Sequence, residues 1–184
     1  MRTAPRNGIG LWRDRRGIAA VEFALIAPAL LVVFLGVIEM SFRFRAAEET
    51  TRFTQEVADL VSRQETFSTS ALEDLYDASV YMMKPLEATD RLDLDVVSVG
   101  YANDADATPS VFWRRSLGVP VDVDLDESRG LGGKNESVIR VAVRYRYDSP
   151  FTTLFRGPTV NIRRVAYARP RLTRLITMDG AVQE

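Results

Sequence analysis

The stretch IAAVEFALIAPALLVVFLGVIEM, residues 18–40, decides how this chain is organised. Within it only Glu22 and Glu39 are charged. A helix rising about 1.5 Å per residue would reach about 34 Å over this stretch, enough to cross a hydrocarbon core about 30 Å thick. We therefore predict a transmembrane helix over residues 18–42.

The residues before this helix form a basic leader, residues 1–17. Its charged side chains are Arg2, Arg6, Arg13, Arg15 and Arg16, with Asp14 as the acid. Basic residues favour the cytoplasmic side of a membrane, so we predict a cytoplasmic leader and an extracytoplasmic domain over residues 43–184. A cleaved secretory signal peptide is the alternative, but its small-x-small motif, at residues 27–29, falls in the middle of the apolar stretch.

The composition argues against most enzyme chemistry. The chain has no His and no Cys, which removes imidazole bases, thiolate nucleophiles and the usual zinc ligands. We expect no enzymatic activity, no metal site and no cofactor. The chain has 24 Lys and Arg residues and 25 Asp and Glu residues, which gives a formal net charge of -1. Nucleic acid is therefore not an expected partner.

The polar and helix-breaking residues of the apolar stretch are candidate functional residues. A carboxylate deep in a bilayer costs about 2.5–3.5 kcal/mol on insertion scales, and such residues usually have a function. We assign one to Glu22, which sixteen uncharged residues follow, and keep Glu39, at the end of the stretch, as a secondary candidate. Pro28 removes a backbone donor and predicts a kink or local melting of the helix.

The residues around Gly17 resemble a known processing site. The sequence Arg15-Arg16-Gly17, followed by IAAVEF at residues 18–23, resembles the site at which type IV prepilins are cut. In that family a membrane aspartyl peptidase cleaves after a glycine, and a glutamate is the fifth residue of the mature chain. The resemblance implies cleavage between Gly17 and Ile18, and it identifies Glu22 as the processing and assembly glutamate.

The wider stretch, residues 13–40, is similar to the TadE-like pseudopilins of tight-adherence (Flp) pilus assembly systems. Gly36 and Glu39 match the Gly-x-x-Glu element of that family. Phe23 departs from the Tyr of the major Flp pilins, which implies a minor, pilin-like subunit that supports pilus assembly.

The resemblance also implies a location and partners. The location is the bacterial cytoplasmic (inner) membrane, crossed once. The partners are a prepilin peptidase, the lipid bilayer, the inner-membrane assembly platform, and other pseudopilins and the major pilin, met through the N-terminal helix. An uncleaved single-pass scaffold protein of an envelope complex is the alternative function.

The chemistry of the processing site is consistent with this interpretation. Glycine lets an extended backbone enter a peptidase cleft closely. Cleavage would give Ile18 an α-amine that is mostly cationic at neutral pH and could pair with Glu22 of a neighbouring subunit. Ile18 and Glu22 are also i and i+4 on one helix, so an intramolecular pair competes with the intermolecular one.

The remainder of the chain predicts an α+β, pilin-like domain. An amphipathic helical stem, residues 43–62, continues the membrane helix and places one face toward a core: Ala46, Thr50, Phe53, Val57 and Leu60. A short second helix is expected after the capping residues 68–70 and before Pro85. Alternating apolar residues then predict three or four antiparallel strands, with one face of the sheet toward solvent: residues 92–97, 111–115, 139–147 and 159–168.

Two polar clusters of this domain are given structural rather than functional roles. Asp122, Asp124 and Asp126 resemble the start of a calcium loop, but the glycine and glutamate that such a loop requires are missing. A basic stripe, Arg140, Arg144 and Arg146 with Arg163 and Arg164 near it, predicts a solvated face or ion pairs with Asp93 and Asp95. A hydrolase using Asp93 and Asp95 would lack an oxyanion stabiliser.

Overall fold

The computed structural model describes residues 17–151 and 159–179, and the chain divides between Ser41 and Phe42 into two compact units. The first unit contains the N-terminal part of helix α1 (Ile18–Ser62). Pro28 lies inside α1, which continues through it without a break, so the predicted local melting is not observed and the kink stays a prediction. Apart from Gly17, the predicted basic leader lies outside the described residues.

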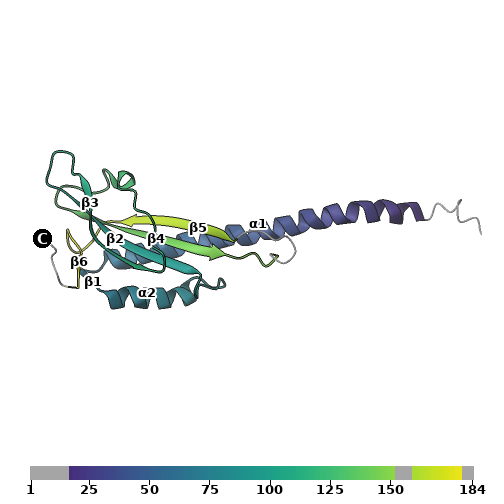
Figure 1. The fold of residues 1–184 in the computed structure, drawn as a ribbon, viewed down its shortest axis with the longest axis horizontal. Helices are drawn as coiled ribbons and strands as arrows, with labels where there is room; N and C mark the ends of the chain where they lie inside the picture. Colours follow the sequence, from purple (N-terminus) through teal and green to yellow (C-terminus); the bar gives the residue numbers. More distant parts are fainter. Residues whose placement is uncertain (1–16, 152–158, 180–184) are drawn as a thin grey trace, which may run out of the picture. The chain divides into compact units, whose positions relative to one another are not determined.

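The second unit is built on a four-stranded antiparallel sheet (Figure 1). Its strands are β2 (Leu92–Tyr101), β3 (Pro109–Leu117), β4 (Ser137–Tyr147) and β5 (Val160–Ala168). Their order is β3-β2-β4-β5, so β2 and β4 are central and β3 and β5 are the edges. The predicted α+β fold, a long apolar helix followed by an antiparallel sheet domain, is confirmed.

Helices cover one face of this sheet, which we call the helical face. The stem of α1 packs there through Ala46, Phe53 and Val57, as its spacing predicts. Helix α2 (Thr69–Met82) lies on the same side and contributes Leu72 to the core (Figure 1). Its N-cap is Ser68, whose Oγ accepts a hydrogen bond from a backbone N–H of the first turn at 3.1 Å.

The last turn of the stem differs from the prediction. Leu60 is 42% exposed, and Val61 is buried in its place. The reason is that the chain after β5 returns to the end of α1, where the backbone N–H of Arg171 donates to the carbonyl oxygen of Ser62 at 2.9 Å. The helix end is therefore packed by a segment that the spacing of apolar residues in the helix does not reveal.

A second, two-stranded sheet closes the core. Strand β1 (Thr66–Phe67) pairs in parallel with β6 (Thr177–Met178). Next to this pair the indole Nε1 of Trp113 donates to the carbonyl oxygen of Ile176 at 2.7 Å, and the Trp113 ring stacks on Phe67 with centroids 5.4 Å apart. These contacts tie the C-terminal segment to strand β3.

We call the opposite face of the sheet the loop face. The prediction that this face is open to solvent is wrong. The β3–β4 connection, residues 118–136, covers it and includes the short 3-10 helix η3 (Asp126–Ser128). A small second core forms there: Val97, Val99, Tyr101 and Val138. Nearly all of β2 and β4 is buried on both faces as a result.

Candidate functional site

The predicted processing site lies at the start of α1. Gly17 is exposed directly before the helix, and a Cβ built on it would meet nothing within 4 Å. Among the residues that the structure describes, no packing contact requires glycine at position 17.

Glu22 is exposed on α1, one helical turn after Ile18, which is 51% exposed. Glu39 is half-buried near the other end of the apolar stretch. The structure therefore places the two predicted acids at separate positions along the helix rather than in one cluster.

Among the described residues of its unit, none covers the apolar stretch, residues 18–40. Its large exposed side chains include Val21, Phe23, Leu25, Ile26, Leu30, Leu31, Val32, Val33, Phe34, Val37 and Met40. Among the described residues, α1 is the one helix that is long and apolar enough to cross a membrane. A helix that is apolar on all sides needs lipid or other helices around it.

Residues 17–59 match the family of TadE-like proteins. The match confirms the resemblance predicted from the sequence, and it indicates involvement in tight-adherence (Tad) pilus assembly. The TadE-like segment contains Gly17, Glu22 and Glu39 and ends inside the stem of α1, so the sheet lies outside it. No curated protein and no solved structure matches the chain.

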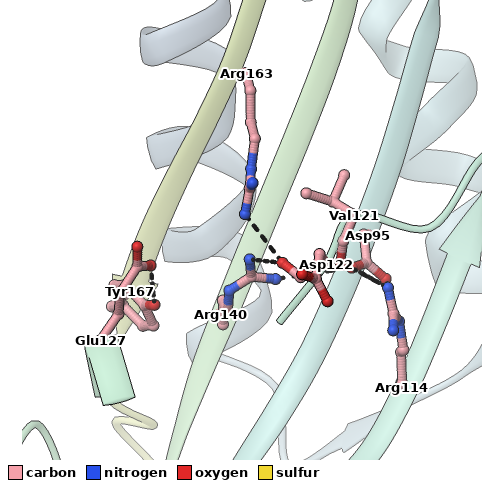
Figure 2. Close-up of polar contacts among 8 residues, drawn as sticks. All are labelled: Asp95, Arg114, Val121, Asp122, Glu127, Arg140, Arg163 and Tyr167. Atoms are coloured by element: carbon pink, nitrogen blue, oxygen red, sulfur yellow. Dashed lines mark hydrogen bonds and ion pairs between the residues drawn. The ribbon is translucent and has the colours of Figure 1, made fainter. Parts of the chain in front are cut away.

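The second predicted cluster, the basic stripe, forms ion pairs on the loop face. Asp95 is fully buried and accepts two hydrogen bonds from Arg114, from Nε and Nη2, both at 2.9 Å. Arg140 is also fully buried, and its Nη1 lies 3.8 Å from Asp95 Oδ2. Figure 2 shows that Arg140 and Arg163 also converge on the carbonyl oxygen of Asp122, at 2.8 and 3.0 Å.

Asp93 is the centre of a neighbouring group of ion pairs. Its Oδ2 accepts a hydrogen bond from Arg146 Nη1 at 2.9 Å and lies 3.8 Å from Arg144 Nη1. Its Oδ1 accepts a hydrogen bond from the backbone N–H of Val119 at 3.1 Å. Gly118 makes this approach possible, because its φ is +85° and a Cβ there would lie 2.2 Å from Asp93 Oδ1. The predicted cross-strand ion pairs are thus present, whereas the solvated face is not.

These arginines fasten the β3–β4 connection to the sheet. Arg114, Arg140 and Arg163 all donate to backbone carbonyl oxygens of residues 121 and 122. Asp93 and Asp95 are 2% and 0% exposed, so neither carboxylate is accessible to a substrate. Within residues 17–151 and 159–179, no group of acidic side chains is placed to hold a metal ion, the three aspartates at 122, 124 and 126 included.

Arg164 lies on the other face of β5 from Arg163, although the two are adjacent in the predicted stripe. Its Nε donates to Thr51 Oγ1 of α1 at 2.8 Å. Sequence reasoning did not identify this contact between the edge strand and the stem. The alternation of side chains along β5 contains the signal, because successive residues point to opposite faces.

Two buried tyrosines, Tyr101 and Tyr145, and the half-buried Tyr167 link the stability of the domain to pH through their pKa values. Burial raises the pKa of Tyr101, Tyr145 and Tyr167. The hydroxyl of Tyr101 donates a hydrogen bond to the carbonyl oxygen of Ser128 at 2.6 Å. Only the neutral, protonated tyrosine can make this bond. The unfolded chain releases these protons near pH ~10, while the folded chain still holds them.

We therefore expect the stability of a fragment 42–184 to fall as the pH rises above about 10, because the unfolded state then binds fewer protons than the folded state. Below about pH 10 the contribution of these tyrosines to the stability of the fragment is fully present. Urea unfolding at about pH 9 and about pH 11 measures the difference, and Tyr101→Phe should reduce it. Equal unfolding midpoints at the two pH values would contradict the role of these tyrosines.

Proposed function

We propose that this protein is a minor, pilin-like subunit that is processed after Gly17 by a prepilin peptidase and is required to assemble a tight-adherence (Flp) type IVb pilus. The observation that carries the proposal is the exposed Glu22, one helical turn beyond the Gly17-Ile18 bond and inside the TadE-like segment. The protein acts through assembly rather than catalysis.

In the proposed mechanism the apolar part of α1 first anchors the subunit in the inner membrane, with the leader in the cytoplasm. Cleavage then removes the leader and creates a cationic α-amine on Ile18. Glu22 of a neighbouring subunit neutralises this amine, which lowers the cost of keeping both charges near the apolar phase. The exposed apolar side chains of α1 then pack against other pilin-like helices instead of lipid.

Gly36 supports the helix-packing step. A glycine inside a helix costs about 0.8–1 kcal/mol relative to alanine. A Cβ at this position would meet nothing within 4 Å, so the fold of the single chain does not require glycine there. A small residue on an apolar helix allows another helix to approach closely.

Replacement of Gly17 by leucine is expected to block processing almost completely. A leucine side chain would obstruct entry of the backbone into the peptidase cleft, while no described residue comes within 4 Å of the Cβ position in the folded chain. The measurement is the intact mass and N-terminal peptide of the protein extracted from native membranes, with and without the host's prepilin peptidase. The wild-type chain should begin at Ile18 only when the peptidase is present.

Gly36→Leu is the matched control, because it makes the same change at another unpacked glycine of α1. It should leave the cleavage after Gly17 unchanged. A wild-type chain that still begins at Met1 would favour the uncleaved scaffold protein. A Gly17→Leu chain that is cleaved normally would mean that the processing site is elsewhere.

A further inference from the structure

We propose that the open edge of strand β5 binds an extended, acidic segment of another protein, which adds to the sheet as a fifth strand. This surface belongs to the unit 42–184. The inference goes beyond the proposed function and holds whether or not the chain is processed after Gly17.

The first observation is that β5 is an unpaired edge. Over Val160–Ala168 it pairs with β4, and alternate residues of such a strand direct their N–H and C=O groups away from the partner. In the described parts of the chain, the turn and loop hydrogen bonds between backbone groups involve no residue of β5. The opposite edge differs, because α2 contacts β3.

The second observation is a groove that runs beside this edge. One hollow of about 460 Å³ lies between α1 and the end of β5, and a second of about 440 Å³ lies between α1 and Arg164. Gln55 lines both hollows, so they are neighbours along α1, and we call the two together the β5 groove. Ala58, Ala166 and Ala168 line the first hollow, and their small side chains leave room for an apolar side chain of an added strand.

The third observation is an excess of positive charge along this edge. Four arginines line the β5 groove, Arg52, Arg164, Arg169 and Arg171, against the two acids Glu48 and Asp59. Arg163 extends the charge on the loop face of β5, outside the groove. Arg163, Arg164 and Arg169 take part in none of the ion pairs found among the described residues. Neutral oxygens hold them instead: Arg164 donates to Thr51 Oγ1, and Arg169 Nε donates to the carbonyl oxygen of Leu131 at 2.9 Å. Cations that are fixed in place without a carboxylate partner are complementary to an acidic segment.

These charges also argue against a second copy of the chain as the partner. Arg164 is the middle residue of β5, so a symmetric antiparallel β5–β5 pair in full register would place it opposite its own copy. Like charges directly opposite each other destabilise strand pairing. The fitting occupant is a strand of a different protein with acidic residues opposite Arg163 and Arg164 and an apolar residue toward Ala166.

Fluorescence anisotropy with the full chain in detergent micelles tests the proposal. The probe is a labelled synthetic peptide of about nine residues, built of alternating valine and threonine with two adjacent glutamates at its centre. The comparison peptide has two lysines instead. We expect the glutamate peptide to bind at least about tenfold more tightly than the lysine peptide and to lose affinity as salt rises.

Two variants examine the two parts of the surface. Arg163→Gln with Arg164→Gln removes the charges, and Ala166→Leu fills the groove without changing charge; each should weaken binding of the glutamate peptide about tenfold. Arg115→Gln is the matched control. Arg115 lies on the other edge strand with an equivalent environment, its Nε near Thr69 Oγ1 at 3.4 Å and its Nη1 donating to the preceding carbonyl at 3.1 Å.

Binding that Arg115→Gln leaves unchanged and that both β5 variants weaken would support the proposal. Equal affinity for the two peptides, absence of binding, or equal losses from Arg115→Gln and the β5 arginine variant would overturn it. Circular dichroism of each variant verifies the fold. If the arginine variant does not fold, Ala166→Leu and the comparison of the two peptides still test the proposal, because neither removes an arginine contact.

Discussion

Replacing Glu22 with alanine is expected to abolish pilus assembly while the protein still inserts into the membrane. Insertion becomes easier, because the change removes a carboxylate that costs about 2.5–3.5 kcal/mol at the centre of a bilayer. Assembly fails because the α-amine of Ile18 then has no carboxylate to neutralise it when subunits meet. Glu22 is exposed on α1, so its substitution removes no core packing.

The measurement separates insertion, processing and assembly. Immunoblots of membrane fractions report insertion, the intact mass reports cleavage after Gly17, and electron microscopy with sheared surface fractions reports pili. Glu22→Gln keeps the size of the side chain and removes its charge, so it should fail in the same way as Glu22→Ala. Glu39→Ala is the control at the second acid of the apolar stretch and should affect piliation less.

Normal pili in cells that carry only Glu22→Ala would refute the assembly role of this residue. Loss of cleavage together with loss of pili would move the role of Glu22 from assembly to recognition by the peptidase. Because cleavage is measured on the same samples, the two results are distinguishable.

The sequence contains most of the information about the helices and strands of this fold. The apolar run from Ile18 predicts the long helix, and the alternation from Ile139 to Tyr147 predicts strand β4, because both patterns are local. The family match likewise covers a local pattern, residues 17–59. These features follow from the spacing of residues along the chain and do not depend on which distant segments pack together.

The parts that could not be predicted depend on segments that are distant in sequence. The β3–β4 connection has no regular apolar spacing, so its cover over the loop face, and the burial of Arg140 beneath it, were not foreseen. The pairing of Thr66 with Thr177 joins two very short strands from opposite ends of the domain. The β5 groove is similarly formed by α1 and β5, and neither element alone indicates it.

Replacing Asp95 with alanine is expected to lower the free energy of unfolding of the fragment 42–184 by about 3–5 kcal/mol. Asp95 is fully buried and is the carboxylate for both Arg114 and Arg140. Arg140 is the more vulnerable partner, because it is 0% exposed and its Nε and Nη1 have no hydrogen-bond partner in the described structure. Without Asp95 its charge would remain buried and uncompensated.

Urea unfolding measures this loss, and Asp126→Ala is the control. Asp126 also pairs with an arginine, Arg129, at 2.7 Å, but its side chain is 79% exposed, so its removal should cost far less than the removal of Asp95. Similar losses for the two aspartates would mean that burial does not determine the strength of these pairs.

A double substitution distinguishes a buried ion pair from a generally fragile strand. Arg140→Leu removes the charge that Asp95→Ala leaves unpaired, so the double variant should be less destabilised than the sum of the two single variants, by at least about 1 kcal/mol. Additive losses would show that the two residues act independently. Because Arg140 also holds Asp122 at 2.8 Å, Arg140→Leu alone should release the β3–β4 connection, which limited proteolysis at residues 118–136 would detect. The same release in Asp95→Ala would show that this carboxylate keeps Arg140 in the position from which it fastens the connection.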